Sequence, residues 1–318
     1  MNQQLRDVID RAQDIFLITH VDPDGDAIAS TLGLAHALKR MGKRYSLACA
    51  DPIPETFCFL PGVQEFGTPE IGGADLVIAV DDSDPDRFGH PYEDIPSLGI
   101  PIVNIDHHVT NTRFGAINVV RTEAAATSEI VFDLVQDWGV PIDPQLATYL
   151  LTGIVTDTQS FTTSSTTPDS LEIAARLVRA GASLTEINES VYKQRRLATL
   201  RLWGKVLDRI QLDGDLVWSV NTRDMQAQCG TQSDDGDGVV NLLATTREAR
   251  AAIVFRENET GQIDVSIRSR PGVDISAMAV GFGGGGHPQA AGTTLTGDLE
   301  QIVPQVLRKA KQVLASSG

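Results

Sequence analysis

The first half of this chain alternates short apolar runs with longer stretches of helical periodicity, and this alternation constrains the fold more than any other feature. Four runs have the length and composition of buried strands: IFLIT (15–19), YSLAC (45–49), ADLVIAV (74–80) and IPIVNI (100–105). Helical spacing separates or follows them over residues 27–42, 124–138, 145–156 and 168–181. Strands that alternate with helices pair in parallel, so the pattern predicts an α/β domain with a mostly parallel sheet.

The second half has the pattern of a separate, smaller domain. A basic helical stretch is followed by three strand-like runs, a helix near 274–282, the glycine-rich cluster GFGGGGHPQAAG (281–292) and a last helix near 298–315. The 318 residues also exceed the usual size of one domain and fit two. We therefore expect a first domain over 1–187, a connecting helix over 188–210 and a smaller α/β domain over 211–318.

The composition is that of a globular protein with small partners. A net charge of −16 opposes binding along extended nucleic acid, so a small anionic substrate would need local positive charge or bound cations. Cys49, Cys58 and Cys229 are too scattered for a metal knuckle and too few for a disulfide scaffold, which favours a reducing compartment. The first residues lack the pattern of a signal peptide, and no apolar run reaches the ~18 residues of a membrane span. These features predict a cytoplasmic protein without a membrane partner.

Acidic and histidine residues directly follow four of the apolar elements. The segment HVDPDGD places His20, Asp24 and Asp26 behind the first run. Carboxyl ends of parallel strands meet at the sheet edge where α/β proteins bind ligands. Helix capping by aspartate explains each cluster singly, whereas convergence at one edge explains all of them together. The other clusters are Asp81 with Asp82, Asp106 to His108, and Asp157.

Convergence would gather four carboxylates in one cleft. Asp24, Asp26, Asp81 and Asp157 cannot all stay ionised there without cations. Two divalent ions neutralise them, and a mixed carboxylate and imidazole ligand set suits Mn²⁺, with Mg²⁺ or Co²⁺ as alternatives. Paired metal ions are a recurrent device for in-line displacement at phosphorus. The sequence therefore predicts a two-metal site that cleaves phosphate esters.

Taken in order, the motifs HVDPDGD, DDSD, DHH with VTNTRFG, and TDT resemble the four motifs of the DHH phosphoesterase family. The cluster GGGGHPQAAG is similar to the glycine-histidine motif of the DHH-associated C-terminal domain. The resemblance covers nearly the whole chain, and the length and layout look most like the NrnA-type subgroup. Membership of that subgroup implies degradation of short oligoribonucleotides and dephosphorylation of adenosine 3′,5′-bisphosphate in the cytoplasm.

The resemblance also implies roles for individual residues. His108 would lie close to the scissile phosphate, and Asp106 would orient the histidines. Gln159 stands where many family members have glycine, a departure that bears on substrate preference. Asp81 would bridge the two metal ions. The implied ligands are His20, Asp24 and Asp81 for one Mn²⁺, and Asp26, Asp81, His107 and Asp157 for the second.

The glycine-rich cluster formally contains a dinucleotide-binding fingerprint, but it follows a helical stretch where that fingerprint requires a strand. A phosphate-binding loop is the better interpretation, because bare backbone amides approach an anion closely and the histidine can donate to it. A flexible connector is the alternative. Two arginines end the preceding strand-like run, and guanidinium groups bind phosphate oxygens in pairs. The predicted substrate-binding residues are Arg268, Arg270, Gly284, Gly285, Gly286 and His287.

We therefore predict a Mn²⁺-dependent phosphoesterase that hydrolyses short oligoribonucleotides, adenosine 3′,5′-bisphosphate or both, by attack of a metal-activated hydroxide. Three alternatives stay open: a cyclic-dinucleotide phosphodiesterase, an inorganic pyrophosphatase and a catalytically silent nucleotide sensor. A pyrophosphatase leaves the glycine-histidine cluster unexplained, and a sensor has little reason to keep a complete ligand set. The expected partners are short RNA or small nucleotides rather than long nucleic acid, and a homodimer is compatible with the sequence.

Overall fold

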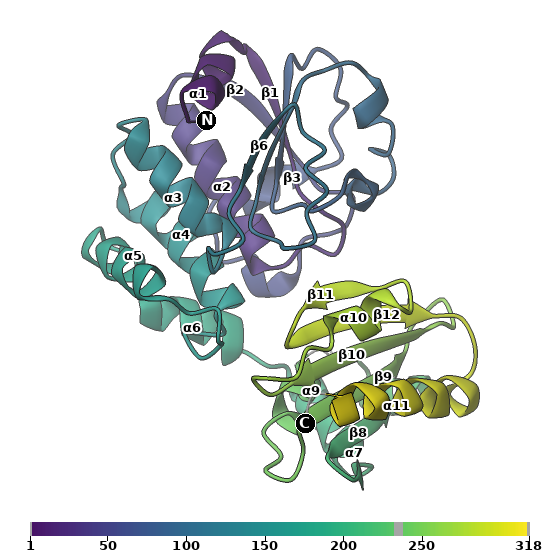
Figure 1. Ribbon diagram of the computed structural model, residues 1–318. Coiled ribbons are helices and arrows are strands. Elements are labelled where there is room, and N and C mark those ends of the chain that lie inside the picture. Colours follow the sequence, from purple (N-terminus) through teal and green to yellow (C-terminus); the bar gives the residue numbers. More distant parts are fainter. Residues whose placement is uncertain (1, 232–237, 317–318) are drawn as a thin grey trace. The chain divides into compact units, whose positions relative to one another are not determined.

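The computed structural model describes residues 2–231 and 238–316 of the chain. The chain divides into two compact units, Met1–Gln194 and Arg195–Gly318 (Figure 1). Each unit has its own six-stranded sheet and its own apolar core. The predicted fold class, a mostly parallel α/β domain followed by a smaller α/β domain, is confirmed.

The sheet of the first unit is parallel throughout. Its strands are β1 (Asp14–Ile18), β2 (Arg44–Ala48), β3 (Phe66–Gly67), β4 (Leu76–Val80), β5 (Ile102–Asp106) and β6 (Ile117–Val120), in the order β3-β2-β1-β4-β5-β6. The order reverses between β1 and β4, and open α/β sheets bind ligands outside the carboxyl ends of the strands at such a point. The register aligns Ile18 with Ala79 and Val80 with Ile105, so β1, β4 and β5 end at nearly the same level.

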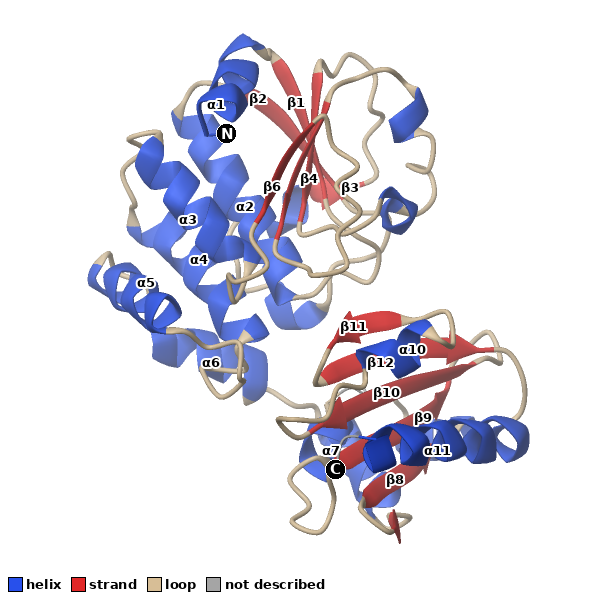
Figure 2. Cartoon of the chain, in the orientation of Figure 1, coloured by secondary structure: helices blue, strands red, loops and turns tan. Residues whose placement is uncertain are grey.

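Helices cover one face of this sheet, and loops with short helices cover the other (Figure 2). Ile15 and Leu17 of β1 belong to the core on the helical side, whereas Phe16 and Ile18 belong to the core on the opposite face. The helices are α1 (Asn2–Arg11), α2 (Gly25–Arg40), α3 (Thr127–Asp137), α4 (Pro144–Asp157), α5 (Pro168–Arg179) and α6 (Leu184–Tyr192). The short helices are η1 (Glu55–Phe57), η2 (Val63–Glu65), η3 (Pro85–Phe88) and η4 (Ile95–Ser97).

Two glycines allow α2, α3 and α4 to approach one another closely. A Cβ atom on Gly25 of α2 would lie 2.3 Å from the Thr156 side chain of α4. A Cβ atom on Gly153 of α4 would lie 2.0 Å from Ser128 Oγ of α3. Real Cβ contacts are longer than this, so larger residues would push the helices apart. The start of α2 therefore lies beside the end of α4.

The second unit has a mixed sheet. Its strands are β7 (Gln211–Asp213), β8 (Leu216–Asn221), β9 (Ala251–Glu257), β10 (Ile263–Ser269), β11 (Gly285–His287) and β12 (Ala290–Leu295), in the order β11-β12-β10-β9-β8-β7. The pair β8 and β9 is parallel, and the other pairs are antiparallel. One apolar core joins a face of the sheet to the first three helices of the unit, and a second core joins the other face to the last two. These helices are α7 (Leu197–Leu207), α8 (Arg223–Cys229), α9 (Val239–Leu243), α10 (Ser276–Val280) and α11 (Leu299–Ser316).

The single connecting helix predicted over 188–210 is wrong, because two helices occupy this stretch. α6 ends at Tyr192 and α7 begins at Leu197. The physical reason is that the two halves pack in different cores: Val191 is buried in the first unit and Leu202 in the second. The helix expected near 274–282 is also shorter than predicted, since α10 ends before the glycine-rich cluster. No described helix combines the length and the apolar composition that a membrane crossing requires.

Candidate functional site

Three predicted metal ligands lie just beyond strand ends at the carboxyl edge of the first sheet. His20 follows β1, Asp81 follows β4 and His107 follows β5. All three side chains are buried, with exposed fractions of 5% or less. The aligned register of these strands explains why residues so far apart in sequence meet at one edge.

The other three predicted ligands come from helix ends. Asp24 caps α2, where its side chain accepts hydrogen bonds of 3.0 Å from the N–H groups of Asp26 and Ala27. Asp26 lies in the first turn of α2 and is fully buried. Asp157 is the last residue of α4. Because Gly25 allows the two helices to approach, the start of α2 and the end of α4 reach the same edge as the strand ends.

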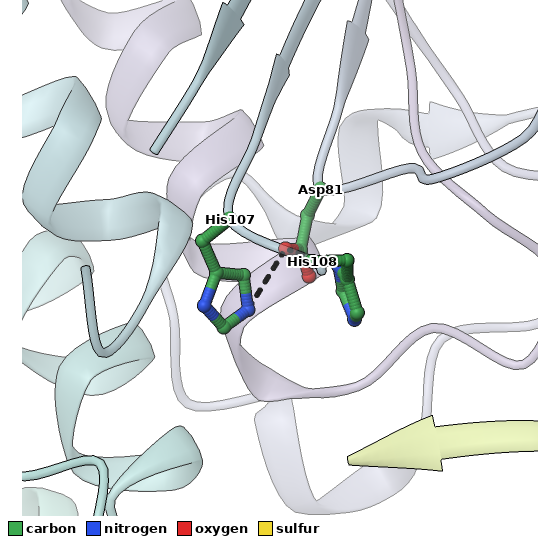
Figure 3. Close-up of side chains that lie close together, drawn as sticks. All are labelled: Asp81, His107 and His108. Carbon is green, nitrogen blue, oxygen red and sulfur yellow. Dashed lines mark ion pairs between the residues drawn. The ribbon is translucent and has the colours of Figure 1, made fainter. Parts of the chain in front are cut away.

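Asp81 lies at the centre of the cluster, beside both histidines of the DHH motif (Figure 3). Its Oδ1 is 3.7 Å from His107 Nε2 and 3.7 Å from His108 Nδ1, and its Oδ2 is 3.9 Å from His20 Nε2. The backbone of Asp81 is left-handed, with φ of 61°, which costs a residue other than glycine about 1–3 kcal/mol. The tight turn after β4 thus places a strained, fully buried carboxylate between three imidazoles.

Potential ligand atoms form three groups, and the atoms of each group lie within 4.8 Å of one another. Two of the groups, which share no residue, together contain the six residues predicted as metal ligands. Asp81 belongs to two groups and also lies near His107 of the remaining one, as a bridging ligand would. The groups are His20, Asp24 and Asp81; Asp26, His107 and Asp157; and Asp81, His107 and His108.

The two histidines predicted as ligands present the same nitrogen to the cluster. His20 Nδ1 lies 2.7 Å from the Val21 carbonyl oxygen, and His107 Nδ1 lies 3.2 Å from the Ala124 carbonyl oxygen. A neutral imidazole that donates from Nδ1 to such a carbonyl presents the Nε2 lone pair on the side of the carboxylates, as a metal ligand requires. A ligating imidazole is normally oriented by a hydrogen bond from the nitrogen that does not bind the metal, here Nδ1. On the other side of the ring, His107 Nε2 is 3.1 Å from Asp157 Oδ2.

The electrostatics of the cluster favour a bound cation. Burial, reinforced by neighbouring carboxylates, raises the pKa of both Asp26 and Asp81 well above the usual value. Burial and the Arg87 guanidinium lower the pKa of His20, which keeps this imidazole neutral as a ligand must be. Within the described part of the chain, Asp81 Oδ2 is buried without a hydrogen-bond partner. The residues present therefore fit a divalent cation, which would pair with that oxygen and offset the repulsion.

Asp106 and His108, predicted to act beside the metal ligands, form a hydrogen-bonded pair. His108 Nδ1 lies 2.7 Å from Asp106 Oδ1, and the Asn111 amide donates to Asp106 Oδ2 at 2.5 Å. Burial acts to raise the pKa of Asp106, but the hydrogen bonds from His108 and Asn111 outweigh it and lower the pKa to about 2. Asp106 therefore stays ionised and fixes the orientation of His108. Asn111 escaped the sequence analysis, although it lies in the VTNTRFG segment that follows the DHH motif.

A second contribution that sequence reasoning missed comes from the start of α3. The backbone N–H groups of Thr127 and Ser128 donate to the carboxylate of Asp26, and the Thr127 hydroxyl donates to Asp81. A signal was present in the sequence. Ala126 precedes this helix and has no side chain that can cap it, so the helix start needs an acceptor from elsewhere.

The segment after Asp157 explains the preference for glycine that the resemblance implies at position 159. Gln159, Ser160 and Phe161 have φ values of 45°, 59° and 66°, so three successive residues adopt the left-handed conformation. Glycine reaches this conformation without strain, whereas the Cβ atom of glutamine makes the same conformation energetically unfavourable. The departure at position 159 therefore keeps the backbone turn and adds a side chain next to a predicted metal ligand.

Both arginines predicted to bind substrate lie at the end of β10 in the second unit. Arg268 donates through Nε to Asn241 Oδ1 at 2.9 Å and through a terminal nitrogen to the Ile267 carbonyl. Arg270 is exposed and donates to the carbonyl oxygens of Thr246 and Arg247 at 2.8 and 3.1 Å. Each guanidinium is thus already held by protein acceptors, which fixes its position.

The glycine-rich cluster is only partly the loop that the sequence predicts, because Gly285–His287 forms the edge strand β11. A Cβ atom on Gly284 would lie 2.1 Å from the Gly292 carbonyl oxygen, and one on Gly286 would lie 2.4 Å from that of Ala290. Close pairing with β12 therefore requires these glycines, whereas Gly285 faces open space. His287 occupies the same register row as Arg268, with one β12 residue between them, but its side chain lies outside the described residues.

Comparison with known proteins adds independent observations. Two family models match the chain, the DHH family N-terminal domain over residues 14–154 and the DHHA1 domain over residues 225–316. A Thermus thermophilus protein named bifunctional oligoribonuclease and PAP phosphatase NrnA is 39% identical over 313 residues, 96% of this chain and 91% of that protein. A Bacillus subtilis protein of the same name is 29% identical and aligns over 93% of each chain. An exopolyphosphatase-related protein from Bacteroides fragilis has a TM-score of 0.89 at 26% identity, covering 99% of this chain and 95% of that one.

Proposed function

This chain belongs to the DHH family of phosphoesterases, and from that premise we propose that it hydrolyses short oligoribonucleotides and adenosine 3′,5′-bisphosphate with two divalent metal ions. The names of the Thermus thermophilus and Bacillus subtilis relatives support this substrate class. Adenosine 3′,5′-bisphosphate and a short RNA with a 5′-phosphate both carry a scissile phosphate ester and a second phosphate, so one site can serve both. The observation that carries the proposal is the gathering of six ligand residues at one sheet edge: His20, Asp24, Asp26, Asp81, His107 and Asp157.

The proposed metal sites follow the grouping of the side chains. Carboxylate and imidazole ligands suit Mn²⁺, and Mg²⁺ and Co²⁺ are the alternatives. When bound, such ions supply an activated water as nucleophile and neutralise the negative charge that develops on the phosphoryl oxygens during the reaction. Asp81 is the proposed bridge because both of its oxygens face candidate ligands. The first proposed site comprises the group His20, Asp24 and Asp81, and the second comprises the group Asp26, His107 and Asp157 with Asp81, whose Oδ1 lies 3.7 Å from His107 Nε2.

The remaining predicted residues are proposed to contact the reacting phosphate and to bind the rest of the substrate. With Nδ1 of His108 held by Asp106, Nε2 is the ring nitrogen that we propose contacts the reacting phosphate or a proton on it. The second unit is proposed to bind the rest of the nucleotide, because guanidinium groups and bare backbone amides both suit phosphate oxygens. The residues proposed for that role are Arg268, Arg270, Gly284, Gly285, Gly286 and His287.

A substrate panel tests the proposal. Purified protein is stripped of metal, supplied with Mn²⁺ and incubated with a two-nucleotide RNA, a longer RNA, adenosine 3′,5′-bisphosphate, a cyclic dinucleotide and pyrophosphate. We expect release of nucleoside monophosphate from the two-nucleotide RNA, and of phosphate from the bisphosphate, faster than turnover of the other compounds. Turnover of pyrophosphate alone would establish the pyrophosphatase alternative, and preference for the cyclic compound would establish the cyclic-dinucleotide phosphodiesterase.

A matched pair of variants tests the role of the metal cluster. Asp81→Asn keeps the size of the side chain but removes the charge of the bridging ligand, so activity should fall to background. Asp10→Asn makes the same chemical change at an exposed residue whose side chain pairs with Arg6 outside the site, and its activity should equal that of the wild type. Near-normal turnover by Asp81→Asn contradicts the two-metal assignment. Nucleotide binding by the wild type without turnover of any substrate would favour the sensor.

A further inference from the structure

We propose that Thr127 is the positioning residue of this site, which holds Asp26 and Asp81 together and selects the carboxylate oxygens that face the cations; the inference rests on the proposed metal-dependent function. Thr127 is the first residue of α3 and is fully buried. The uncapped helix start that Ala126 leaves indicates an acceptor from elsewhere, but it does not identify Thr127 as part of the site. Its role follows from contacts with two carboxylates that belong to different elements, α2 and the turn after β4.

Thr127 uses two donors, one for each carboxylate. Its backbone N–H donates to Asp26 Oδ2 at 2.5 Å, and its hydroxyl donates to Asp81 Oδ1 at 2.7 Å. Both acceptors are fully buried, where a hydrogen bond to a charged group is strong because water does not compete for it. One residue therefore fixes the separation between a proposed ligand of the second metal and the proposed bridge.

The contacts of Asp26 determine which of its oxygens can bind a cation. Oδ1 accepts two hydrogen bonds from Ser128, one from N–H at 3.1 Å and one from the hydroxyl at 2.6 Å. Oδ1 also faces α4, since a Cβ atom on Gly153 would lie 2.2 Å from it. Among the described residues Oδ2 has a single donor, the N–H of Thr127, and a carboxylate oxygen has two lone pairs. Asp26 therefore offers Oδ2 to the cation.

Asp81 is oriented in the same way. The Thr127 hydroxyl occupies one lone pair of Oδ1 and so fixes the rotation of the carboxylate about its terminal bond. Among the described residues no donor reaches Oδ2, which is buried and points toward His20. Oδ1 keeps a second lone pair, and His107 Nε2 lies 3.7 Å from this oxygen. Asp81 thus keeps one coordinating position for each proposed metal.

The helix start gives this arrangement its rigidity. Ala126 supplies no cap, so the first N–H groups of α3 are satisfied by the carboxylate of Asp26 from α2. The N-terminal end of a helix carries partial positive charge, which stabilises an anion placed there. Asp26 is therefore the cap of α3 as well as a proposed metal ligand, and α3 cannot shift without moving it.

The test compares three variants of the full-length, metal-stripped protein by electron paramagnetic resonance, which reports free Mn²⁺ in a titration. Thr127→Val has almost the same shape but lacks the hydroxyl, and Thr127→Ser keeps it. Thr31→Val is the matched control, because Thr31 is also fully buried in a helix of the first unit and its hydroxyl has no described partner. If Thr127→Val fails to fold by circular dichroism, Thr127→Ala takes its place, since it also lacks the donor.

We expect Thr127→Val to bind Mn²⁺ about 10–100-fold more weakly than the wild type, the usual effect of losing a residue that orients a ligand. Thr127→Ser should restore the affinity, and Thr31→Val should leave it unchanged. Equal affinity of Thr127→Val and the wild type overturns the inference. So does a Thr127→Ser variant that binds as weakly as Thr127→Val, because shape rather than the hydroxyl would then be responsible.

Turnover of the two-nucleotide RNA by the wild type is measured in parallel, so that the two proposals can fail separately. A wild type that binds Mn²⁺ but hydrolyses no substrate refutes the proposed function, while the ratio of Mn²⁺ affinities still decides the role of Thr127. A wild type that hydrolyses substrate while Thr127→Val retains full affinity refutes only the inference. A wild type that binds no divalent cation overturns both.

Discussion

Replacing Gly153 with alanine tests whether close helix packing builds the site. Gly153 lies in α4, and its missing side chain leaves room for two polar groups that are hydrogen-bonded to each other at 2.6 Å, Ser128 Oγ and Asp26 Oδ1. A Cβ atom would lie 2.0 Å from the first and 2.2 Å from the second, whereas ordinary contacts begin at 3.4 Å. At least one group must move by more than an ångström, and neither has open space to enter because both are buried.

The magnitude follows from three contributions to the free energy of unfolding. Overpacking of a buried contact costs about 1–3 kcal/mol. Loss of a hydrogen bond to a charged group adds about 1.5–3 kcal/mol. Alanine recovers about 1 kcal/mol because it favours a helix more than glycine does. We therefore expect Gly153→Ala to lower the stability of the first unit by about 1.5–5 kcal/mol, and to weaken Mn²⁺ binding because Asp26 moves.

Hydrogen exchange of peptides from α2 and α4 measures the stability of the first unit apart from the second. The control is Gly204→Ala in α7 of the second unit, where a Cβ atom meets nothing within 4 Å, so exchange of the α2 and α4 peptides should not change and peptides from α7 should show only the gain of about 1 kcal/mol from helix propensity. If Gly153→Ala exchanges as slowly as the wild type and binds Mn²⁺ equally well, the packing argument is refuted. Faster exchange with unchanged Mn²⁺ affinity would support the predicted loss of stability but refute the link between this packing and metal binding.

Three further predictions concern single groups. Thr31→Val should raise the free energy of unfolding by about 1 kcal/mol, because it removes a buried hydroxyl that has no described partner; urea denaturation measures this. Asp106→Asn should lower kcat about 10–100-fold with a smaller change in KM, since the amide holds His108 less firmly; steady-state kinetics would contradict this if kcat were unchanged. Mn²⁺ binding should release protons and weaken as the pH falls, because the raised pKa values of Asp26 and Asp81 keep both protonated to higher pH in the metal-free protein and a ligand must be ionised. Calorimetry in buffers of different ionisation enthalpy detects that release, and its absence would contradict the assignment.

The apolar runs of the sequence predicted most strands of the first sheet, since β1, β2, β4 and β5 lie within or close to the four runs. The two short edge strands β3 and β6 were not predicted, because two to four residues with partly exposed side chains leave no clear pattern. The connecting helix was wrong for a related reason. Helical periodicity continues through residues 188–210, and only the division of the apolar side chains between two cores ends one helix and starts another.

Within the site, residue type and position predicted the charged groups, whereas the groups that orient them required the structure. A carboxylate that directly follows an apolar run is visible in the sequence. The hydrogen bond between Thr127 and Asp26 joins residues 101 positions apart, and no local pattern indicates such a contact. The left-handed backbone conformation of Asp81 cannot be read from the sequence either, because aspartate adopts ordinary backbone conformations at most positions. In the glycine-rich cluster, composition alone does not distinguish a phosphate loop from tight pairing of β11 with β12.

The site depends on two kinds of residue that act differently. Carboxylates and imidazoles supply the proposed coordinating atoms, while Gly25 and Gly153 supply none and allow α2, α3 and α4 to approach until those atoms lie within reach of one another. The two glycines face different partners, Thr156 and the Asp26–Ser128 pair, so each controls a separate contact. A chain with every ligand but with larger residues at these two positions would hold Asp26 and Asp157 farther apart. A complete set of ligand residues is therefore a weaker indication of metal-dependent activity than the same set together with the small residues that let its helices meet.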